Sequence, residues 1–173
     1  MNVTDGDTRD ELRAAIDGLT DEQARTLLGW AHTIGRKSPV LSEEHTVGAL
    51  GDLLGIISEV QEPGHVRMRL TVDPAWHNPH GVLHGGVIYT MVDYSMGGAV
   101  MRSLPEGQLC TTIEIKISYL APVREGTLIV ETDVARQGRN IAFTESKVTD
   151  ERDRLVATAS GSMFILRPAD STE

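Results

Sequence analysis

The stretch that decides the fold reads Val87-Ile88-Tyr89-Thr90-Met91-Val92-Asp93-Tyr94-Ser95-Met96-Gly97-Gly98-Ala99-Val100-Met101. Small and apolar residues recur here in pairs four positions apart, the spacing that lines one face of an α-helix. The pairs are Val87/Ile88, Met91/Val92, Ser95/Met96 and Ala99/Val100. Because most other positions are also small or apolar, we expect a helix that is buried on nearly every side.

The segments after this helix, and one before it, have the pattern of β-strands. Residues 65–72 and 113–119 alternate between apolar and polar side chains, and further strands are expected at 127–135, 141–148 and 155–166. The gaps between the last strands are short, which favours hairpins and an antiparallel meander. The sequence therefore predicts an α+β domain in which a curved antiparallel sheet wraps around one central helix.

The N-terminal region has the pattern of two amphipathic helices. Thr8 with Glu11, and Thr20 with Gln23, both match a capping box, so residues 8–36 predict a helical hairpin. A short helix is expected at about 43–54. We divide the chain into an N-terminal helical extension (1–40), a main domain (41–168) and a tail (169–173). Packing against the domain or an oligomer contact explains the extension better than a lid does.

Composition and charge exclude several classes of protein. The chain has 173 residues, 40% of them hydrophobic and 24% charged, which is typical of a globular protein. A net charge of −9 argues against a nucleic-acid partner, and no segment approaches the ~20 apolar residues of a membrane span. The only cysteine, Cys110, excludes an intrachain disulfide, and the polar, acidic N-terminus does not resemble a secretory signal. We expect a cytoplasmic protein.

Asp93 is the first candidate for chemistry. It is the only charged residue between Gly86 and Arg102, and a carboxylate in an apolar helix is costly unless it is paired or used. A structural aspartate, bonded to an arginine or a backbone amide, explains the pattern equally well at this point.

The start of the helix, His84-Gly85-Gly86, is the second candidate. Two glycines are unfavourable in a first helical turn unless another group must approach the backbone closely. Free N–H groups there could stabilise a developing oxyanion, although a tight turn has the same pattern. His77, His80 and His84 lie close in sequence, but their spacing across a loop does not match a zinc site, so we expect no metal.

Taken together, Asn78, His84-Gly85-Gly86 and Asp93 resemble the Asn-x5-His-Gly-Gly-x6-Asp signature of hotdog-fold acyl-CoA thioesterases of the phenylacetate-degradation type. The likeness covers roughly residues 45–166. It implies the hotdog fold and hydrolysis of an acyl- or aryl-CoA thioester. Gly85 would offer its N–H to the thioester carbonyl, His84 and Asn78 would orient that region, and Asp93 would act as general base or nucleophile.

Further assignments follow from the same resemblance. Counting back from Ser118-Tyr119, Thr112 falls where relatives carry a hydroxyl that places the water, whereas counting forward from Asp93 gives Thr111, so one residue is inserted between them. Strand alternation puts Thr112 on the side of Glu114 and Lys116, which conflicts with that role. Three arginines near strand ends are candidates to bind coenzyme A phosphates, although an ordinary surface role explains each of them better: Arg124, Arg136 and Arg139. Coenzyme A would enter as part of the substrate, and no other cofactor is expected.

A single chain is not expected to form the whole site. Gly85 and Asp93 are eight residues apart on one helix, or about 12 Å along its axis at ~1.5 Å per residue. We therefore expect a homodimer, or a homotetramer, with shared sites. Two other functions stay open: a hotdog hydratase or dehydratase that uses His84 with Asp93, and a non-catalytic acyl-CoA-binding protein. The acyl group itself is not specified.

Overall fold

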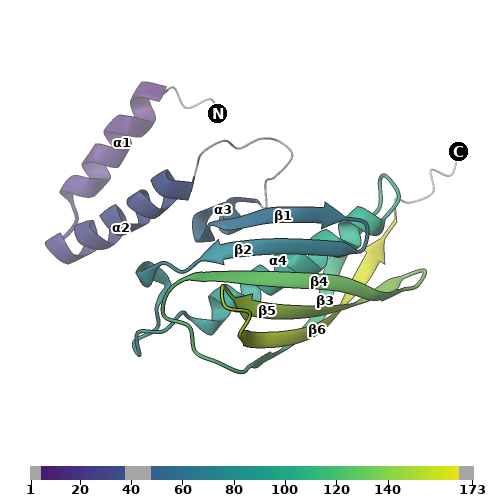
Figure 1. Ribbon diagram of the computed structural model, residues 1–173. Coiled ribbons are helices and arrows are strands. Elements are labelled where there is room, and N and C mark those ends of the chain that lie inside the picture. Colours follow the sequence, from purple (N-terminus) through teal and green to yellow (C-terminus); the bar gives the residue numbers. More distant parts are fainter. Residues whose placement is uncertain (1–4, 38–47, 168–173) are drawn as a thin grey trace, which may run out of the picture.

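The computed structural model describes residues 5–37 and 48–167, and Figure 1 shows one antiparallel sheet with a long helix against it. The helices are α1 (Asp5–Asp17), α2 (Asp21–Lys37), α3 (Gly48–Leu54) and α4 (Gly85–Ser103), with a short 3-10 turn at Pro74–Trp76. The strands are β1 (Ile56–Glu62), β2 (His65–Thr71), β3 (Leu109–Tyr119), β4 (Thr127–Gln137), β5 (Ile141–Asp150) and β6 (Leu155–Leu166).

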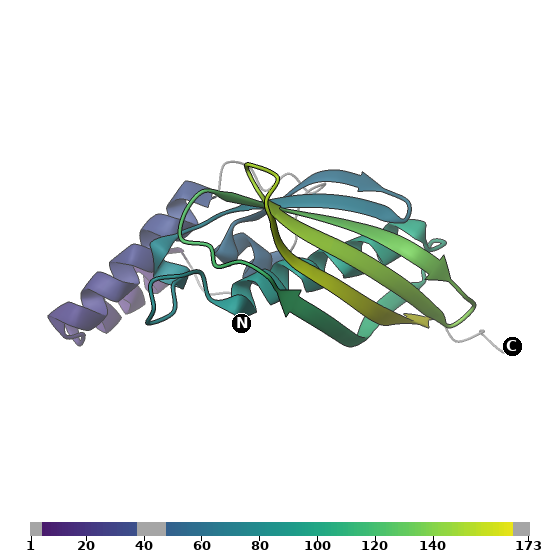
Figure 2. The ribbon, with the colours of Figure 1, turned by 60° about the horizontal axis from the view of Figure 1, so that its bottom comes forward.

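The strand order in the sheet is β1-β2-β4-β5-β6-β3, with every neighbouring pair antiparallel. The expected meander is correct for β4, β5 and β6 but wrong for β3, which lies at the far edge. Figure 2 shows the reason: α4 crosses one face of the sheet between β2 and β3, so the chain emerges at the opposite edge. Short loops indicate only that two consecutive strands can form a hairpin, so loop length does not predict this crossover.

Strand β1 was not predicted, because a β-bulge interrupts its alternation. Ser58 pairs with Met68 and Val60 pairs with Arg67, so Glu59 is an extra residue. The same irregularity occurs in three other strands, at Ile113, Ala135 and Val156. Bulges bend a strand and increase its twist, which helps the sheet to curve around α4.

The core fills the space between the concave face of the sheet and α4. Met91 and Met96 of α4, Leu70 of β2, Leu128 of β4 and Met163 of β6 are completely buried. A chain of buried hydroxyls crosses the same core. Ser95 on α4 donates to Thr132 on β4 at 2.7 Å, and Thr132 shares a hydrogen bond of 2.6 Å with Ser146 on β5. These bonds satisfy polar groups that would otherwise destabilise an apolar interior.

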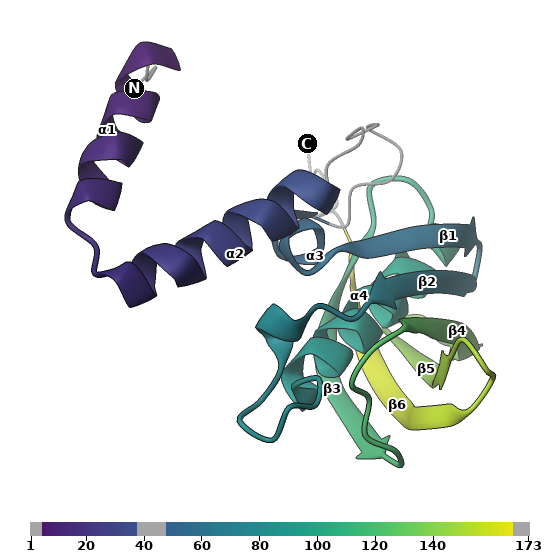
Figure 3. The ribbon, with the colours of Figure 1, turned by 60° about the vertical axis from the view of Figure 1, so that its left-hand side comes forward.

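The N-terminal helices differ in detail from the prediction. The capping box at Thr20 is confirmed, since its hydroxyl and the Gln23 side chain each bond the other's backbone N–H. Thr8 is not a cap, because α1 begins at Asp5. Figures 1 and 3 show α1 and α2 diverging from their turn instead of forming a packed hairpin. The predicted boundary at residue 40, the start of the helix at 43 and the tail at 169–173 lie outside the described residues.

Within the two described ranges, every helix is too short or too polar to cross a bilayer.

Candidate active site

The first turn of α4 leaves one backbone donor unused. His84 is the N-cap residue, and its ring Nδ1 accepts the N–H of Gly86 at 3.0 Å. The N–H of Val87 donates to the His84 carbonyl at 3.0 Å. The N–H of Gly85 has no acceptor among the described residues. The unused donor is therefore the Gly85 N–H, at the positive end of the helix dipole. It is the same group that the resemblance in the sequence offers to the thioester carbonyl.

Asn78 fixes the loop that leads into α4. Its Oδ1 accepts the N–H of His80 at 2.9 Å, and its own N–H donates to the carbonyl of Val82 at 2.8 Å. The chain is then tied on both sides, because the His84 N–H bonds Trp76 and the Leu83 N–H bonds Val123, at 2.9 and 2.7 Å. The Asn78 side chain thus stabilises a turn that determines how His84 enters the helix.

Tyr119, at the end of β3, holds Gly85 from the other side. Its hydroxyl donates to the Gly85 carbonyl at 2.9 Å. A Cβ on Gly85 would lie 3.2 Å from Tyr119 Cζ, which is tighter than an ordinary contact, so any side chain there would push the ring away by a few tenths of an ångström. Burial, with a smaller contribution from Tyr89, raises the pKa of the Tyr119 phenol. Sequence reasoning gave this residue no role, although it lies within the segment that resembles the family.

Asp93 lies on a row of α4 residues that faces β3. Positions 85, 89, 93, 97 and 101 share one side of the helix, and each is at least partly exposed. The hydroxyl of Thr112 on β3 donates to Asp93 Oδ1 at 2.7 Å, and Cys110 Sγ lies 3.7 Å from the Gly97 carbonyl. The expectation that α4 is buried on nearly every side is therefore wrong on this side. Since β3 is an edge strand, the row lies beside an open edge.

The bulge at Ile113 explains why Thr112 faces the helix. Thr112 pairs with Met163 and Glu114 pairs with Ser162, so the strand gains one residue between them. Uninterrupted alternation would have put Thr112 on the same side as Glu114, which was the conflict in the sequence. The extra residue reverses the alternation and brings Thr112 onto the side of α4.

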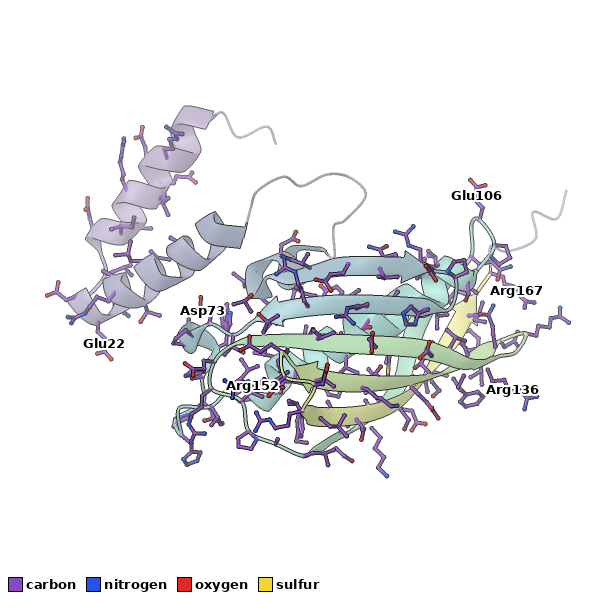
Figure 4. The ribbon with its side chains drawn as sticks, in the orientation of Figure 1. Glu22, Asp73, Glu106, Arg136, Arg152 and Arg167 are labelled. Atoms are coloured by element: carbon purple, nitrogen blue, oxygen red, sulfur yellow. The ribbon has the colours of Figure 1, made fainter. Side chains whose placement is uncertain are left out.

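The three candidate arginines do not gather in one chain. Arg124 lies at the end of the sheet near Gly85. Its carbonyl contacts His77 Nε2 at 2.9 Å, and the preceding residue, Val123, accepts the N–H of Leu83, just before α4. Arg136 and Arg139 flank Gln137, whose side chain bonds Ser103 at the opposite end of α4. Figure 4 shows Arg136 and Arg152 toward opposite ends of the sheet. Arg152 lines the same cleft as Arg124 and is a cation that the sequence reasoning omitted.

The loop histidines point to separate partners. His77 bonds the Arg124 carbonyl through Nε2, whereas His84 bonds the Gly86 N–H through Nδ1. Across residues 5–37 and 48–167, no group of three or more His, Cys, Asp or Glu side chains is placed to hold a metal ion.

Two comparisons decide the family. The model of the thioesterase superfamily matches residues 80–157. A putative esterase from Saccharolobus solfataricus is 31% identical over 120 residues, which cover 69% of this chain and 79% of that protein. The chain belongs to the thioesterase superfamily. The matched range takes in the α4 row, Thr112 and Tyr119.

This thioesterase is also similar to acyl-coenzyme A thioesterase 13 of Homo sapiens, at 29% identity over 101 residues that cover 57% of this chain and 71% of that one. A solved structure described as a hypothetical thioesterase with coenzyme A, from Streptococcus pneumoniae, superposes with a TM-score of 0.61. It is 26% identical and covers 65% of this chain and 88% of its own. The predicted hotdog fold and the predicted class, a thioester hydrolase, are confirmed.

Proposed function

We propose that this protein hydrolyses acyl-CoA thioesters to the free acid and coenzyme A, with Asp93 as the reacting carboxylate and the Gly85 N–H as the group that polarises the carbonyl. One observation carries the proposal. The unused donor of the first turn and the carboxylate lie in the same row of α4, beside an open sheet edge. The similarity to an acyl-CoA thioesterase supports the choice of substrate.

The chemistry needs both groups on one carbonyl. As a nucleophile attacks the carbonyl carbon, negative charge develops on the carbonyl oxygen, and an N–H fixed nearby stabilises that charge. Asp93 either removes a proton from the attacking water or attacks directly to form an acyl-enzyme that water then cleaves. In both routes the thiolate of coenzyme A leaves and takes up a proton. Thr112 holds one oxygen of Asp93 and so limits its orientation.

The site that we propose is shared between two chains. Because Gly85 and Asp93 are separated by about 12 Å along α4, one rigid helix does not bring both to the same carbonyl. A second copy related by a two-fold axis, with its α4 antiparallel to the first, places its Asp93 opposite this Gly85. Pairing through β3 would also cover the exposed edge of the sheet. We therefore propose a homodimer as the active unit, alone or within a homotetramer.

The same pairing accounts for the separated arginines. In an antiparallel pair, the end of the second chain that carries Arg136 and Arg139 comes toward the end of the first chain that carries Gly85 and Arg124. Coenzyme A is long and carries several phosphates, so guanidinium groups from both chains fit its recognition. In this proposal, Arg124 of one chain and Arg136 and Arg139 of the other contact the phosphates.

The two alternative functions find less support. A hydratase would need His84 as an acid–base group on carbon, and the helix cap already occupies one of its two ring nitrogens, since Nδ1 accepts the Gly86 N–H. A binding protein without catalysis would have no need for a carboxylate in the same helix row as an unused backbone donor. We therefore retain hydrolysis.

The test is release of free thiol from a panel of acyl-CoAs. Wild-type protein should release thiol, and Asp93→Asn should lower kcat by several orders of magnitude, about 3–5 kcal/mol in the barrier, without loss of fold. Glu106→Gln, an exposed carboxylate in the loop after α4, is the matched control and should keep full activity. Hydration without thiol release, or full turnover by Asp93→Asn, would contradict the proposal. Single turnover in oxygen-18 water tests the nucleophile route: water that cleaves the acyl-enzyme anhydride at the Asp93 carboxyl carbon leaves label in Asp93, which the base route never does.

A further inference from the structure

Two clefts flank the first turn of α4, one on each side of the helix. The β3-side cleft, of about 310 Å³, lies between the helix start and the end of β3; besides Gly85 its lining includes Val82, Leu83, Ile88, Tyr119, Leu120 and Val123. The α3-side cleft, of about 370 Å³, lies against α3 and is lined by Leu50, Leu54, Trp76, His84, Gly86 and Thr90 among others. Both volumes fall within the range of small-molecule sites, so size does not distinguish them.

We propose that the β3-side cleft binds the acyl group of the substrate, and that this group is apolar and uncharged. The inference rests on the proposed function, because it takes the thioester carbonyl to sit at the Gly85 N–H. It adds the substrate class and the residues that select it.

The choice between the clefts follows from the hydrogen bonds around them. Gly85, whose N–H has no acceptor among the described residues, lines the β3-side cleft. His84 and Gly86 line the α3-side cleft, and the Gly86 N–H is already bonded to the His84 ring, so this cleft offers no free donor from that residue. Asp93 also turns toward β3, as its hydrogen bond to Thr112 shows. The free donor, the carboxylate row and the β3-side cleft thus lie on one side of α4.

The chemical class follows from the lining of the β3-side cleft. None of its residues is charged, and the Tyr119 hydroxyl, its one polar side-chain group, donates to the Gly85 carbonyl. Leu83, Ile88 and Val123 are each only 4% exposed and form an apolar floor. A carboxylate brought into this cleft would lose water and find no cation among the residues that line it, which is strongly unfavourable. Aliphatic or aromatic acyl groups are therefore favoured over those that end in a carboxylate.

A pair of substrates of equal chain length isolates this effect. Hexanoyl-CoA and adipoyl-CoA both carry six-carbon acyl chains and differ in the terminal carboxylate. We expect the wild-type kcat/KM for hexanoyl-CoA to exceed that for adipoyl-CoA by at least about 100-fold. Leu120 is 56% exposed at the rim, so Leu120→Lys should leave the fold intact and reduce this ratio at least about tenfold by offering adipoyl a cation.

Leu50→Lys is the matched control. Leu50 is 52% exposed on the rim of the α3-side cleft, and the same substitution there should leave the ratio unchanged. A ratio that responds to Leu50→Lys and not to Leu120→Lys would assign the acyl group to the α3-side cleft and overturn the inference. Equal turnover of both substrates by the wild type would also overturn it.

A binding measurement keeps this test separate from the proposed function. Thioether analogues of the two substrates lack the hydrolysable bond, and calorimetry reports their affinity whether or not the protein is active. Tighter binding of the hexanoyl analogue, weakened in Leu120→Lys, supports the cleft even if no thioester is cleaved. Hydrolysis without discrimination between the analogues would instead leave the function standing and remove the cleft assignment.

Discussion

The hydroxyl of Thr112 donates a 2.7 Å hydrogen bond to Asp93 Oδ1 and so connects edge strand β3 to the carboxylate of the central helix. The contact exists because the bulge at Ile113 turns Thr112 inward. One oxygen of Asp93 is thereby held, and the other is left for a water or a carbonyl carbon.

Removing this hydroxyl should affect turnover more than binding. Thr112→Val keeps the shape of the side chain but loses the donor, so we expect kcat to fall about 10-fold, near the upper end of the ~0.5–1.5 kcal/mol net value of one hydrogen bond, with KM within twofold. Thr112→Ser restores the donor and should recover most of kcat. Steady-state kinetics of the three proteins decide the point. Equal losses in Thr112→Val and Thr112→Ser would show that the methyl group, not the hydroxyl, matters.

A shared site predicts complementation between two inactive chains. Asp93→Asn removes the carboxylate, and Gly85→Pro removes the backbone donor, so each homodimer should be nearly inactive. Refolding an equal mixture gives mixed dimers with one working site of two, and statistical pairing should recover about a quarter of wild-type activity.

Gly85→Ala is the matched control for that experiment. Its Cβ meets the Tyr119 ring at the same 3.2 Å, but the N–H is retained. If Gly85→Ala is as inactive as Gly85→Pro, displacement of Tyr119 explains the loss rather than the missing donor. Mixed dimers that stay inactive, with both chains folded and paired, would rule out the shared site.

The proposed dimer also places Tyr89 on its two-fold axis. Tyr89 lies midway between Gly85 and Asp93, so in an antiparallel pair that sets those two opposite each other it must face its own copy. In a Cys110→Ser background, Tyr89→Cys should therefore cross-link to a covalent dimer with a short bismaleimide. Leu50→Cys, exposed on α3, should not. Gel electrophoresis after brief reaction reads the outcome, and a monomeric Tyr89→Cys band would mean a different register.

Cys110 reports the charge of Asp93. Burial raises the pKa of the Cys110 thiol, and the negative charge of Asp93 raises it further, because both disfavour the thiolate. Since the thiolate is the reactive form, alkylation should be slow at pH 8 and accelerate only at higher pH than for a free cysteine. Asp93→Asn removes one of the two causes of the raised thiol pKa. In this variant, alkylation of Cys110 should therefore accelerate at a lower pH than in the wild type. A rate-against-pH profile that does not move would mean that Asp93 carries no charge near this thiol.

Two glycines near α4 should respond with opposite signs to alanine. A Cβ at Gly161 would lie 2.8 Å from Met96 Sδ and 3.0 Å from the Glu114 carbonyl, so Gly161→Ala should cost about 1–3 kcal/mol of unfolding free energy. At Gly98 the nearest atoms are at 3.5 Å, an ordinary contact, and alanine should add ~0.5–1 kcal/mol by helix propensity. Urea denaturation at matched protein concentration measures the unfolding free energy of both variants. A destabilised Gly98→Ala would show that this helix face is more tightly packed than the 3.5 Å contact indicates.

The candidate site was only partly predictable from sequence. The isolation of Asp93 and the glycines at 85 and 86 are local patterns, and both are visible in the chain itself. The contribution of Tyr119 is not, since it lies 34 residues from Gly85 and meets it only through the packing of β3 on α4. The orientation of Thr112 was misjudged for a related reason. A bulge depends on the partner strand, and no spacing within β3 reveals it.

The sequence by itself determined the central helix, five of the six strands and the candidate residues for the chemistry, because apolar periodicity and helix-start patterns act over a few neighbouring residues. Tertiary structure alone decided the position of β3 at the sheet edge, the side of α4 that stays open, and the N–H of the first turn that has no acceptor within residues 5–37 and 48–167. These features depend on which segments meet across the fold, and contacts between distant segments are set by packing the whole core, not by any local pattern.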